Sequence, residues 1–289
     1  MKHIAVIGSG TMGRGIAYTA ALSGFAVTLQ DISLQALEKA KQYIVTLLNS
    51  SVDKGYITSR QRNLVQQNLI YTTDLQVAVN KTDLVIEAIL EIMELKIETF
   101  KKIEQYAPDH AILATNTSTM SPTEIGAATK KPDQFIAMHF FNPVHRMKLI
   151  EIIRGLDTSD ETVATVKAVA EKMAKETVEV NEFPGFVTSR MNCIIGNEAM
   201  NMLMEGVASA EDIDKAIKLG LNHPMGPLEM ADLVGLDSRL RNMEYLYHAL
   251  GEKYRPSPLL VKYVKSGRLG RKSGQGFYNY RQEELTPTK

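Results

Sequence analysis

Short β-branched runs alternate with longer segments of helical period from residue 3 to about residue 182. The apolar runs predict strands at 3–8, 25–31, 83–88, 111–116, 134–140, 148–153 and 177–182. Helices are predicted between them at 12–23, 33–53, 93–106 and 159–175, with Ser33 and either Thr158 or Ser159 as N-caps. Because runs that are apolar throughout suit strands covered on both faces, the pattern predicts an α/β fold with a mostly parallel sheet wrapped by helices.

The pattern changes at the segment Glu182-Phe183-Pro184-Gly185-Phe186, where a Pro-Gly pair interrupts the chain and the β-rich runs stop. Beyond it, the periodicity predicts helices at 186–205, 209–220, 226–234, 236–251 and 257–266. Ser209 with Asp212 resembles a capping box, and Pro258 fits the first turn of a helix. We therefore expect an α/β domain over residues 1–183 and an all-helical domain over residues 184–289.

Composition and charge exclude several classes of protein. The 289 residues are 44% apolar and 23% charged, which is typical of a folded, water-soluble protein and not of a disordered or fibrous one. Lys and Arg together number 33 and so do Asp and Glu, so there is no excess positive charge to bind nucleic acid or an anionic membrane. No Cys/His spacing suggests a metal site.

The single cysteine and the first residues bear on the compartment. Cys193 cannot form an internal disulfide, and it lies in an apolar stretch where a buried, inert thiol is expected. The apolar run Ile4 to Ile7 is too short for the core of a signal peptide, and no later stretch is long enough to span a membrane. We expect a cytoplasmic protein.

The strongest local motif is Gly8-Ser9-Gly10-Thr11-Met12-Gly13, between the first predicted strand and the first helix. Such glycines allow a tight turn, close approach to a pyrophosphate and close packing of helix on strand, while the helix N-terminus offers N–H groups. Asp31 ends the second strand 18 residues after Gly13, where an acid meets the ribose 2′-hydroxyl of a dinucleotide and would repel a 2′-phosphate. NAD is predicted over NADP; the alternative is a glycine-rich turn with no ligand.

A second group of polar residues follows later strands. Ser118 comes just after one strand, and His139 lies at the end of the next in an apolar stretch. In an open α/β sheet, ligands bind beyond the carboxyl ends of the strands. Glu151 stands in the middle of an apolar strand, where a carboxylate needs a partner. A pair between His139 and Glu151 would leave one imidazole nitrogen to accept a proton. The alternatives are a core histidine and a glutamate tucked inward on an edge strand.

Several segments, in order and spread over the whole chain, resemble the L-3-hydroxyacyl-CoA dehydrogenase family, especially its stand-alone bacterial 3-hydroxybutyryl-CoA dehydrogenase branch. They are GSGTMG, Asp31, DLVIEAILE (83–91), NTST (116–119), HFFNPV (139–144), LIEIIRG (149–155), FPGFVTSR (183–190), NHPMGPLEMADLVGLD (222–237) and GRKSGQGFYNY (270–280). The resemblance implies an N-terminal Rossmann-like, NAD-binding domain, a helical C-terminal domain that contributes to substrate binding and dimerisation, and an acyl-CoA substrate.

The resemblance also implies roles for individual residues. It makes His139 the general base for the substrate 3-hydroxyl, Glu151 its orienting partner, and Ser118 a hydrogen-bond partner of the reacting oxygen that also contacts cofactor and CoA. The implied cofactor contacts are Gly8, Gly10, Thr11, Met12, Gly13, Asp31, Glu91, Lys96, Asn142 and Lys272. Lys54 and Lys96 would contact CoA. Alternatively, Glu91 and Lys96 form a solvated pair on a helix face, and Lys54 only ends a helix.

Ser189 departs from the family pattern, in which an asparagine commonly stands in the sequence GF-x-x-N-R and helps to hold the substrate. Serine is shorter and cannot donate and accept over the same span. Asn192, on a neighbouring helix face, could substitute in part. Ser189 is still expected to be the fourth polar residue of the catalytic site.

Three functions are compatible with these residues. The first is NAD-dependent interconversion of (S)-3-hydroxyacyl-CoA and 3-oxoacyl-CoA by a homodimer. The second is dehydrogenation of a 3-hydroxy acid without CoA, such as a sugar acid, which would have no use for Lys54. The third is a non-catalytic NAD-binding structural protein, which would have no reason to bury a His–Glu pair.

Overall fold

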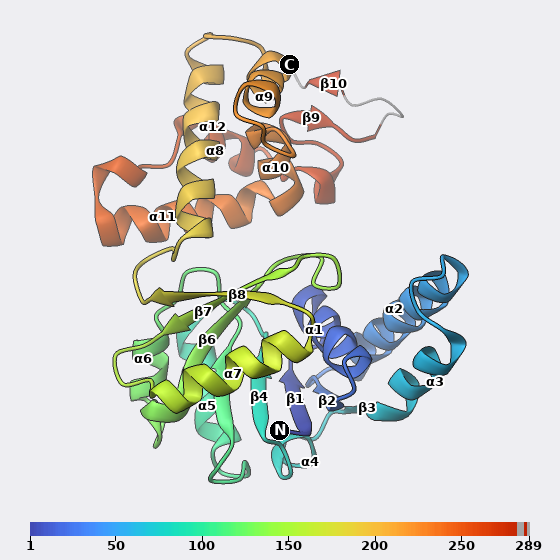
Figure 1. The fold of residues 1–289 in the computed structure, drawn as a ribbon. Helices are drawn as coiled ribbons and strands as arrows, with labels where there is room; N and C mark the ends of the chain where they lie inside the picture. Colours follow the sequence, from blue (N-terminus) through green and yellow to red (C-terminus); the bar gives the residue numbers. More distant parts are fainter. Residues whose placement is uncertain (282–285, 288–289) are drawn as a thin grey trace. The chain divides into compact units, whose positions relative to one another are not determined.

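The polypeptide forms two units in the computed structural model, which describes residues 1–281 and 286–287. The first unit is Met1–Phe183 and the second is Pro184–Lys289 (Figure 1). Each unit has its own hydrophobic core.

The first unit is built on an eight-stranded sheet with the order β3-β2-β1-β4-β5-β6-β7-β8. Its strands are β1 (His3–Ile7), β2 (Ala26–Gln30), β3 (Leu69–Thr72), β4 (Leu84–Glu87), β5 (Ile112–Thr115), β6 (Phe135–Phe140), β7 (Leu149–Arg154) and β8 (Glu176–Asn181). Every neighbouring pair is parallel except β6 and β7. The connection 141–148 between those two is too short for a crossover, so the chain returns antiparallel.

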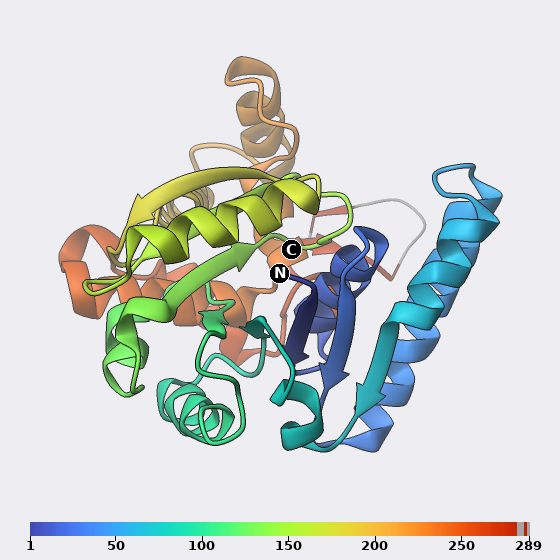
Figure 2. The ribbon, with the colours of Figure 1, turned by 60° about the horizontal axis from the view of Figure 1, so that its bottom comes forward.

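Alternate residues of the central strands face opposite sides of the sheet, as the two-residue period of a strand requires. Ile4 and Val6 of β1 pack with α1 (Thr11–Leu22), α2 (Leu34–Asp53) and α7 (Asp160–Lys172). Ala5 and Ile7 pack with α4 (Leu75–Val79), α5 (Met93–Ile103) and α6 (Pro122–Ala127). Figure 2 shows α7 and α5 on opposite sides of the sheet. The prediction of strands covered on both faces is therefore confirmed.

The N-caps of two predicted helices are also confirmed, because the Ser33 and Ser159 side chains accept hydrogen bonds from the first turns of α2 and α7. Thr158 instead donates its hydroxyl to the carbonyl of Phe135. The sequence pattern does not predict β3, α3 (Ser59–Asn68), α4, α6 or the short turn η1 (Pro132–Gln134). Most of these elements are short, α3 is almost wholly polar, and β3 is a half-exposed edge strand, so none carries a clear apolar period.

The second unit contains five α-helices and two 3₁₀ turns within the described part of the chain. They are α8 (Thr188–Met204), α9 (Ala210–Gly220), α10 (Pro227–Val234), α11 (Leu236–Leu250), η2 (Glu252–Tyr254), α12 (Pro258–Lys265) and η3 (Arg271–Ser273). Ser209 caps α9, and Pro258 occupies the first turn of α12, as predicted. The unit is not purely helical, because β9 (Tyr278–Asn279) pairs with β10 (Thr286–Pro287). Two-residue strands are too short to give a sequence pattern.

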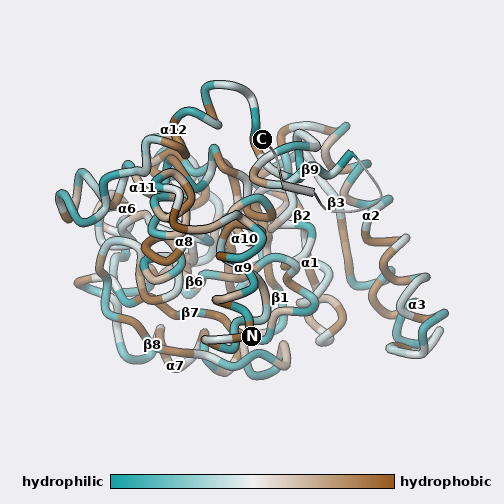
Figure 3. Tube along the Cα trace, turned by 90° about the horizontal axis from the view of Figure 1, so that it is seen from above, coloured by the Kyte–Doolittle hydropathy of each residue, from teal (hydrophilic) through white to brown (hydrophobic). Residues whose placement is uncertain are grey.

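Hydrophobic residues from all five helices form the core of the second unit, and Figure 3 shows hydrophobic stretches along α8. Cys193 is fully buried there, as predicted. None of the helices among residues 1–281 is long and apolar enough to cross a membrane.

Two buried aspartates also hold the second unit together. Asp232 accepts hydrogen bonds from the backbone N–H groups of Phe277 (3.0 Å) and Tyr278 (2.9 Å) and from the Tyr280 hydroxyl (3.0 Å). Asp214 accepts from the first backbone N–H groups of α10 and from the Tyr278 hydroxyl at 2.9 Å. These carboxylates join segments far apart in the sequence.

Candidate active site

The sequence-predicted residues of the first unit gather at the carboxyl ends of its parallel strands. The strand order reverses between β1 and β4, because β2 and β3 lie on one side of β1 and the later strands lie beyond β4. The glycine-rich loop follows β1, Glu91 follows β4, Ser118 follows β5, and His139 lies near the end of β6. A reversal of this kind is where open α/β sheets bind their ligands.

Glycine stands at each of the three positions of the loop for a different physical reason. Gly8 has a φ of +96°, and a Cβ at this position would lie 2.8 Å from the carbonyl oxygen of Ala88. A Cβ on Gly13 would lie 1.8 Å from the carbonyl oxygen of Gly8. A Cβ on Gly10 would meet nothing within 4 Å, so the protein itself does not require glycine there. The open space fits a pyrophosphate brought close to the backbone.

The N-terminus of α1 supports the same conclusion. Thr11 and Met12 begin this helix, and no side chain caps it at Gly10. Its first N–H groups and its dipole are therefore suited to a phosphate. The residues present fit a dinucleotide cofactor.

Asp31 follows β2 and is hydrogen-bonded to the glycine-rich loop. Its Oδ2 accepts hydrogen bonds from the backbone N–H and the hydroxyl of Ser9, both at 2.8 Å. Its Oδ1 accepts from the backbone N–H of Ser33 at 2.9 Å. The carboxylate thus fixes the glycine-rich loop against the start of α2. Repulsion of a 2′-phosphate by Asp31 stays a prediction.

His139 and Glu151 form the predicted pair. They face each other directly in the antiparallel register of β6 and β7, and His139 Nδ1 lies 2.7 Å from Glu151 Oε2. His139 is 6% exposed and Glu151 is fully buried. The alternative of an edge strand is wrong, because β7 lies between β6 and β8. The contact engages Nδ1 of the imidazole. Proton transfer at the other ring nitrogen, Nε2, stays a prediction.

Glu91 holds the loop that carries Ser118. Its Oε1 accepts a hydrogen bond from the Ser118 backbone N–H at 3.0 Å and another from the Thr117 hydroxyl. The neighbouring Asn116 accepts the backbone N–H of Phe140 at 3.0 Å, next to His139. The ends of β5 and β6 are therefore held together, each with a predicted catalytic residue.

Lys96 is fully buried, and this excludes the alternative of a solvated pair with Glu91. Its ammonium lies 2.8 Å from Oε1 of Glu87 and 3.3 Å from Oε2 of Glu91. Glu87, also fully buried, was missed by the sequence analysis. A glutamate ending the apolar strand at 83–88, nine residues before a lysine, was the available indication. Direct contact of Lys96 with cofactor or CoA stays a prediction.

The remaining predicted residues occupy separate positions. Asn142 is exposed just after β6, and Lys54 is the exposed C-cap residue of α2. In the second unit, Ser189 is half-buried in the first turn of α8. Lys272 in η3 forms an ion pair of 2.5 Å with Asp237 of α11. Their roles stay predictions.

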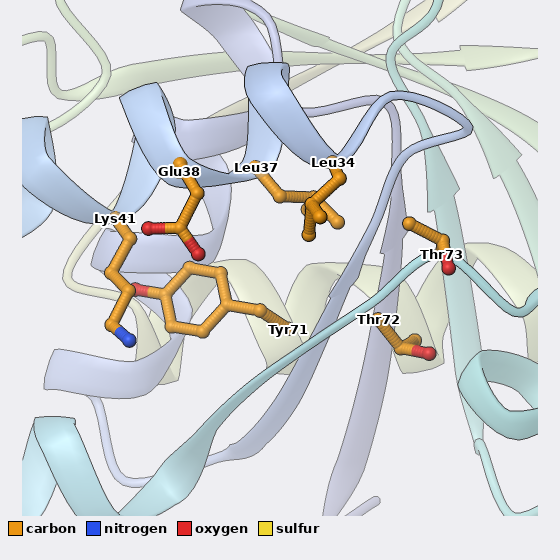
Figure 4. A pocket seen from close by; sticks show the side chains of 7 residues that line it. All are labelled: Leu34, Leu37, Glu38, Lys41, Tyr71, Thr72 and Thr73. Carbon is orange, nitrogen blue, oxygen red and sulfur yellow. The ribbon is translucent and has the colours of Figure 1, made fainter.

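A cavity of about 430 Å³ lies between α2 and β3, beyond Asp31 (Figure 4). Glu38 and Lys41 point from α2 toward the Tyr71 ring, and burial together with Glu38 raises the pKa of Tyr71 to about 12. The cavity is at the edge of the sheet, whereas His139 is on β6. Neither His139 nor Glu151 lines it.

A glycine-rich loop at the strand reversal and a buried His–Glu pair on β6 and β7 define a dinucleotide-dependent dehydrogenase. Residues 3–183 match the NAD-binding domain of 3-hydroxyacyl-CoA dehydrogenase, and residues 185–280 match its C-terminal domain. The chain belongs to the 3-hydroxyacyl-CoA dehydrogenase family, and its first unit is the NAD-binding domain of that family.

Full-length relatives agree with this assignment. The chain is 49% identical over 284 residues to a probable 3-hydroxybutyryl-CoA dehydrogenase of Bacillus subtilis, which covers 98% of this chain and 99% of the relative. It is 38% identical to human mitochondrial hydroxyacyl-coenzyme A dehydrogenase over 97% of this chain and 92% of that one. The crystal structure of (S)-3-hydroxybutyryl-CoA dehydrogenase from Ralstonia eutropha superimposes with a TM-score of 0.93 at 41% identity, covering 98% of this chain and all of the other.

Proposed function

We propose that this protein interconverts (S)-3-hydroxyacyl-CoA and 3-oxoacyl-CoA with NAD, and that 3-hydroxybutyryl-CoA is its substrate. The observation that carries the proposal is the His139–Glu151 pair in the NAD-binding unit. The full-length relatives named as 3-hydroxybutyryl-CoA dehydrogenases support the short acyl chain.

The proposed oxidation divides the work between a base and a hydride acceptor. When bound, NAD would supply the acceptor for the hydride from C3 of the substrate. His139 Nε2 takes the proton of the C3 hydroxyl, so that the C3–O bond becomes a carbonyl as the C–H bond breaks. Glu151 holds the ring through Nδ1 and stabilises the imidazolium that forms. In the reverse direction His139 returns the proton to the oxygen.

Other residues are proposed to bind and orient. Ser118 donates a hydrogen bond to the C3 oxygen and also contacts cofactor and CoA, and Ser189 adds a further, shorter polar contact. The proposed cofactor contacts are those of the glycine-rich loop, Asp31, Glu91, Lys96, Asn142 and Lys272. Lys54 and Lys96 are proposed to meet CoA. Asp31 excludes a 2′-phosphate by like charge.

The experiment is the loss of NADH absorbance with acetoacetyl-CoA, compared with free acetoacetate and with NADPH. We expect turnover with the thioester and NADH, and much lower kcat/KM when either is replaced. Equal activity with free acetoacetate would favour the 3-hydroxy acid alternative. Binding of NADH without turnover of any 3-oxo substrate would favour the non-catalytic alternative.

We also propose that the protein is a cytoplasmic homodimer that contacts itself through the second unit. Exposed apolar side chains on that unit support the dimer, including Met191, Met204 and Leu219. The lone buried Cys193 is consistent with a reducing compartment. Sedimentation velocity of the full chain tests the dimer, and a monomer at micromolar concentration would contradict it.

A further inference from the structure

Glu87 makes four contacts at the end of β4, none of which sequence analysis assigned. Its Oε1 accepts hydrogen bonds from the backbone N–H of Ile89 at 2.7 Å and from Lys96 at 2.8 Å. Its Oε2 accepts from the Thr115 hydroxyl at 2.6 Å and from Lys96 at 3.0 Å. One buried carboxylate therefore joins the turn after β4, the helix α5 and the end of β5.

Lys96 extends these contacts toward the catalytic loop. Its Nζ lies 3.3 Å from Glu91 Oε2 and 3.5 Å from the carbonyl oxygen of Asn116. Glu91 uses its other oxygen to hold Thr117 and Ser118. The order of contacts is thus Glu87 to Lys96, Lys96 to Glu91, and Glu91 to the backbone of Ser118.

The burial of these groups suggests a role beyond stability. Glu87 and Lys96 are both fully buried, and a buried ion pair generally stabilises a fold no more than apolar side chains of similar volume would. Removing only one partner leaves an unpaired buried charge. If the charge of Glu87 were lost, Glu91 would be the nearest carboxylate to Lys96. Its oxygens would turn toward the ammonium and away from Thr117 and Ser118.

We propose that Glu87 is a positioning residue for the dehydrogenase reaction. By holding Lys96, it keeps Glu91 available to fix the loop of Ser118. The inference rests on the proposed function in one respect, namely that Ser118 meets the reacting oxygen. Glu87 itself touches neither substrate nor cofactor in this proposal.

The test compares E87Q with the double variant E87Q/K96M in the full chain. The single variant removes the charge of Glu87 at nearly constant volume, and the double variant also removes the ammonium that would attract Glu91. kcat and KM are measured with NADH and acetoacetyl-CoA well below the melting temperature of each variant. Hydrogen exchange of the Ser118 amide is measured by NMR or mass spectrometry. The control is D214N, which alters a buried carboxylate of the second unit that accepts hydrogen bonds from two backbone N–H groups and a tyrosine hydroxyl.

In E87Q we expect kcat to fall at least about tenfold with little change in KM, and Ser118 exchange to rise about tenfold, as for one lost charge-assisted hydrogen bond. In E87Q/K96M the Ser118 exchange should return to within about threefold of the wild type. Activity of the double variant does not enter the test, because Lys96 is itself a proposed cofactor and CoA contact. D214N should lower the melting temperature and leave kcat and Ser118 exchange unchanged.

Three results would overturn the proposal. One is an E87Q enzyme with wild-type kcat and wild-type exchange at Ser118. Another is a double variant whose Ser118 exchange stays as high as in E87Q, which would mean that attraction to Lys96 is not what draws Glu91 away from Ser118. The third is a D214N control that reproduces the changes at Ser118, which would show a general loss of stability. A wild-type protein that does not reduce acetoacetyl-CoA would refute the proposed function, and the exchange measurement would still decide the positioning role.

Discussion

Each unit of this protein buries a carboxylate completely, but the two carboxylates have different partners. Glu151 in the first unit faces an imidazole, His139, whose proton can move. Asp232 in the second unit faces two backbone N–H groups and a tyrosine hydroxyl. Both are 0% exposed, so burial does not distinguish them. Their hydrogen-bond partners distinguish the two carboxylates. An imidazole makes acid–base chemistry available, whereas backbone N–H groups fix the path of the chain.

The comparison also limits what a perturbed pKa means. Burial raises the pKa of Asp232 to about 6, and the nearby Asp214 adds to the rise. Such a shift in an uncharacterised protein is often taken as a sign of a catalytic group. Here the carboxylate is enclosed by the segments it joins, and a Cβ on Gly276 would lie 1.9 Å from it. The shift is a consequence of packing.

The largest expected effect follows from replacing the base. H139Q should keep the fold and NADH binding but lose kcat by roughly 10²–10⁴-fold, because the amide cannot take up the hydroxyl proton. E151Q should lower kcat by the same factor or less, since Glu151 only orients and polarises the imidazole. Steady-state kinetics with acetoacetyl-CoA check both. Near-normal turnover of H139Q would remove the distinction between the two carboxylates.

Replacing a glycine beside Asp232 should lower the stability of the fold without changing the catalytic chemistry. Gly270 has a φ of +85°, and a Cβ there would lie 2.3 Å from the backbone oxygen of Asp232. G270A should therefore lower the free energy of unfolding by about 3 kcal/mol. As the control, G10A meets no protein atom, so it should keep the wild-type stability and weaken NADH binding. Urea unfolding and NADH fluorescence titration measure the two effects, and equal stabilities of G270A and wild type would contradict the packing argument.

The raised pKa of Asp232 predicts a pH dependence of stability. The folded-state pKa of Asp232, about 6, is above the ordinary value of 3.8. Its contribution to the free energy of unfolding is therefore fully present below pH 3.8 and is lost as the pH rises through 6. The loss between these limits should be about 2 to 3 kcal/mol. The gap in unfolding free energy between wild type and D232N should therefore shrink from pH 4 to pH 7. A gap that is constant or that grows with pH would show that the carboxylate is ionised in the fold at all these values.

The smallest effect tests whether the second unit contributes to the chemistry at all. S189A should lower kcat/KM by the factor that corresponds to the loss of one ordinary hydrogen bond, ~0.5–1.5 kcal/mol of transition-state stabilisation. S118A should lower kcat/KM further. S189N, which restores the common family residue, should be tolerated or improve turnover. A loss in S189A as large as that in H139Q would place an essential group in the second unit.

Most of the fold was accessible from the sequence because its signals are local. Seven of the eight strands of the first unit, together with its helices α1, α2, α5 and α7, follow from apolar runs and periodicity, because residues that share a buried face recur at regular positions along the chain. The polar α3 and the edge strand β3 were missed for the same reason, because little of their surface is buried.

The candidate site divides along the same line. The sequence alone predicted the glycine-rich loop, Asp31 at the end of the second strand, and the requirement of Glu151 for a partner. Each of these predictions depends only on residues that are adjacent or regularly spaced in the sequence. Only the tertiary structure decided that the buried Glu87 and Lys96 form an ion pair that also reaches Glu91, and that Asp232 meets the backbone at Phe277 and Tyr278. These contacts join segments distant in sequence, and a residue's own neighbours along the chain carry no record of which distant segment will pack against it.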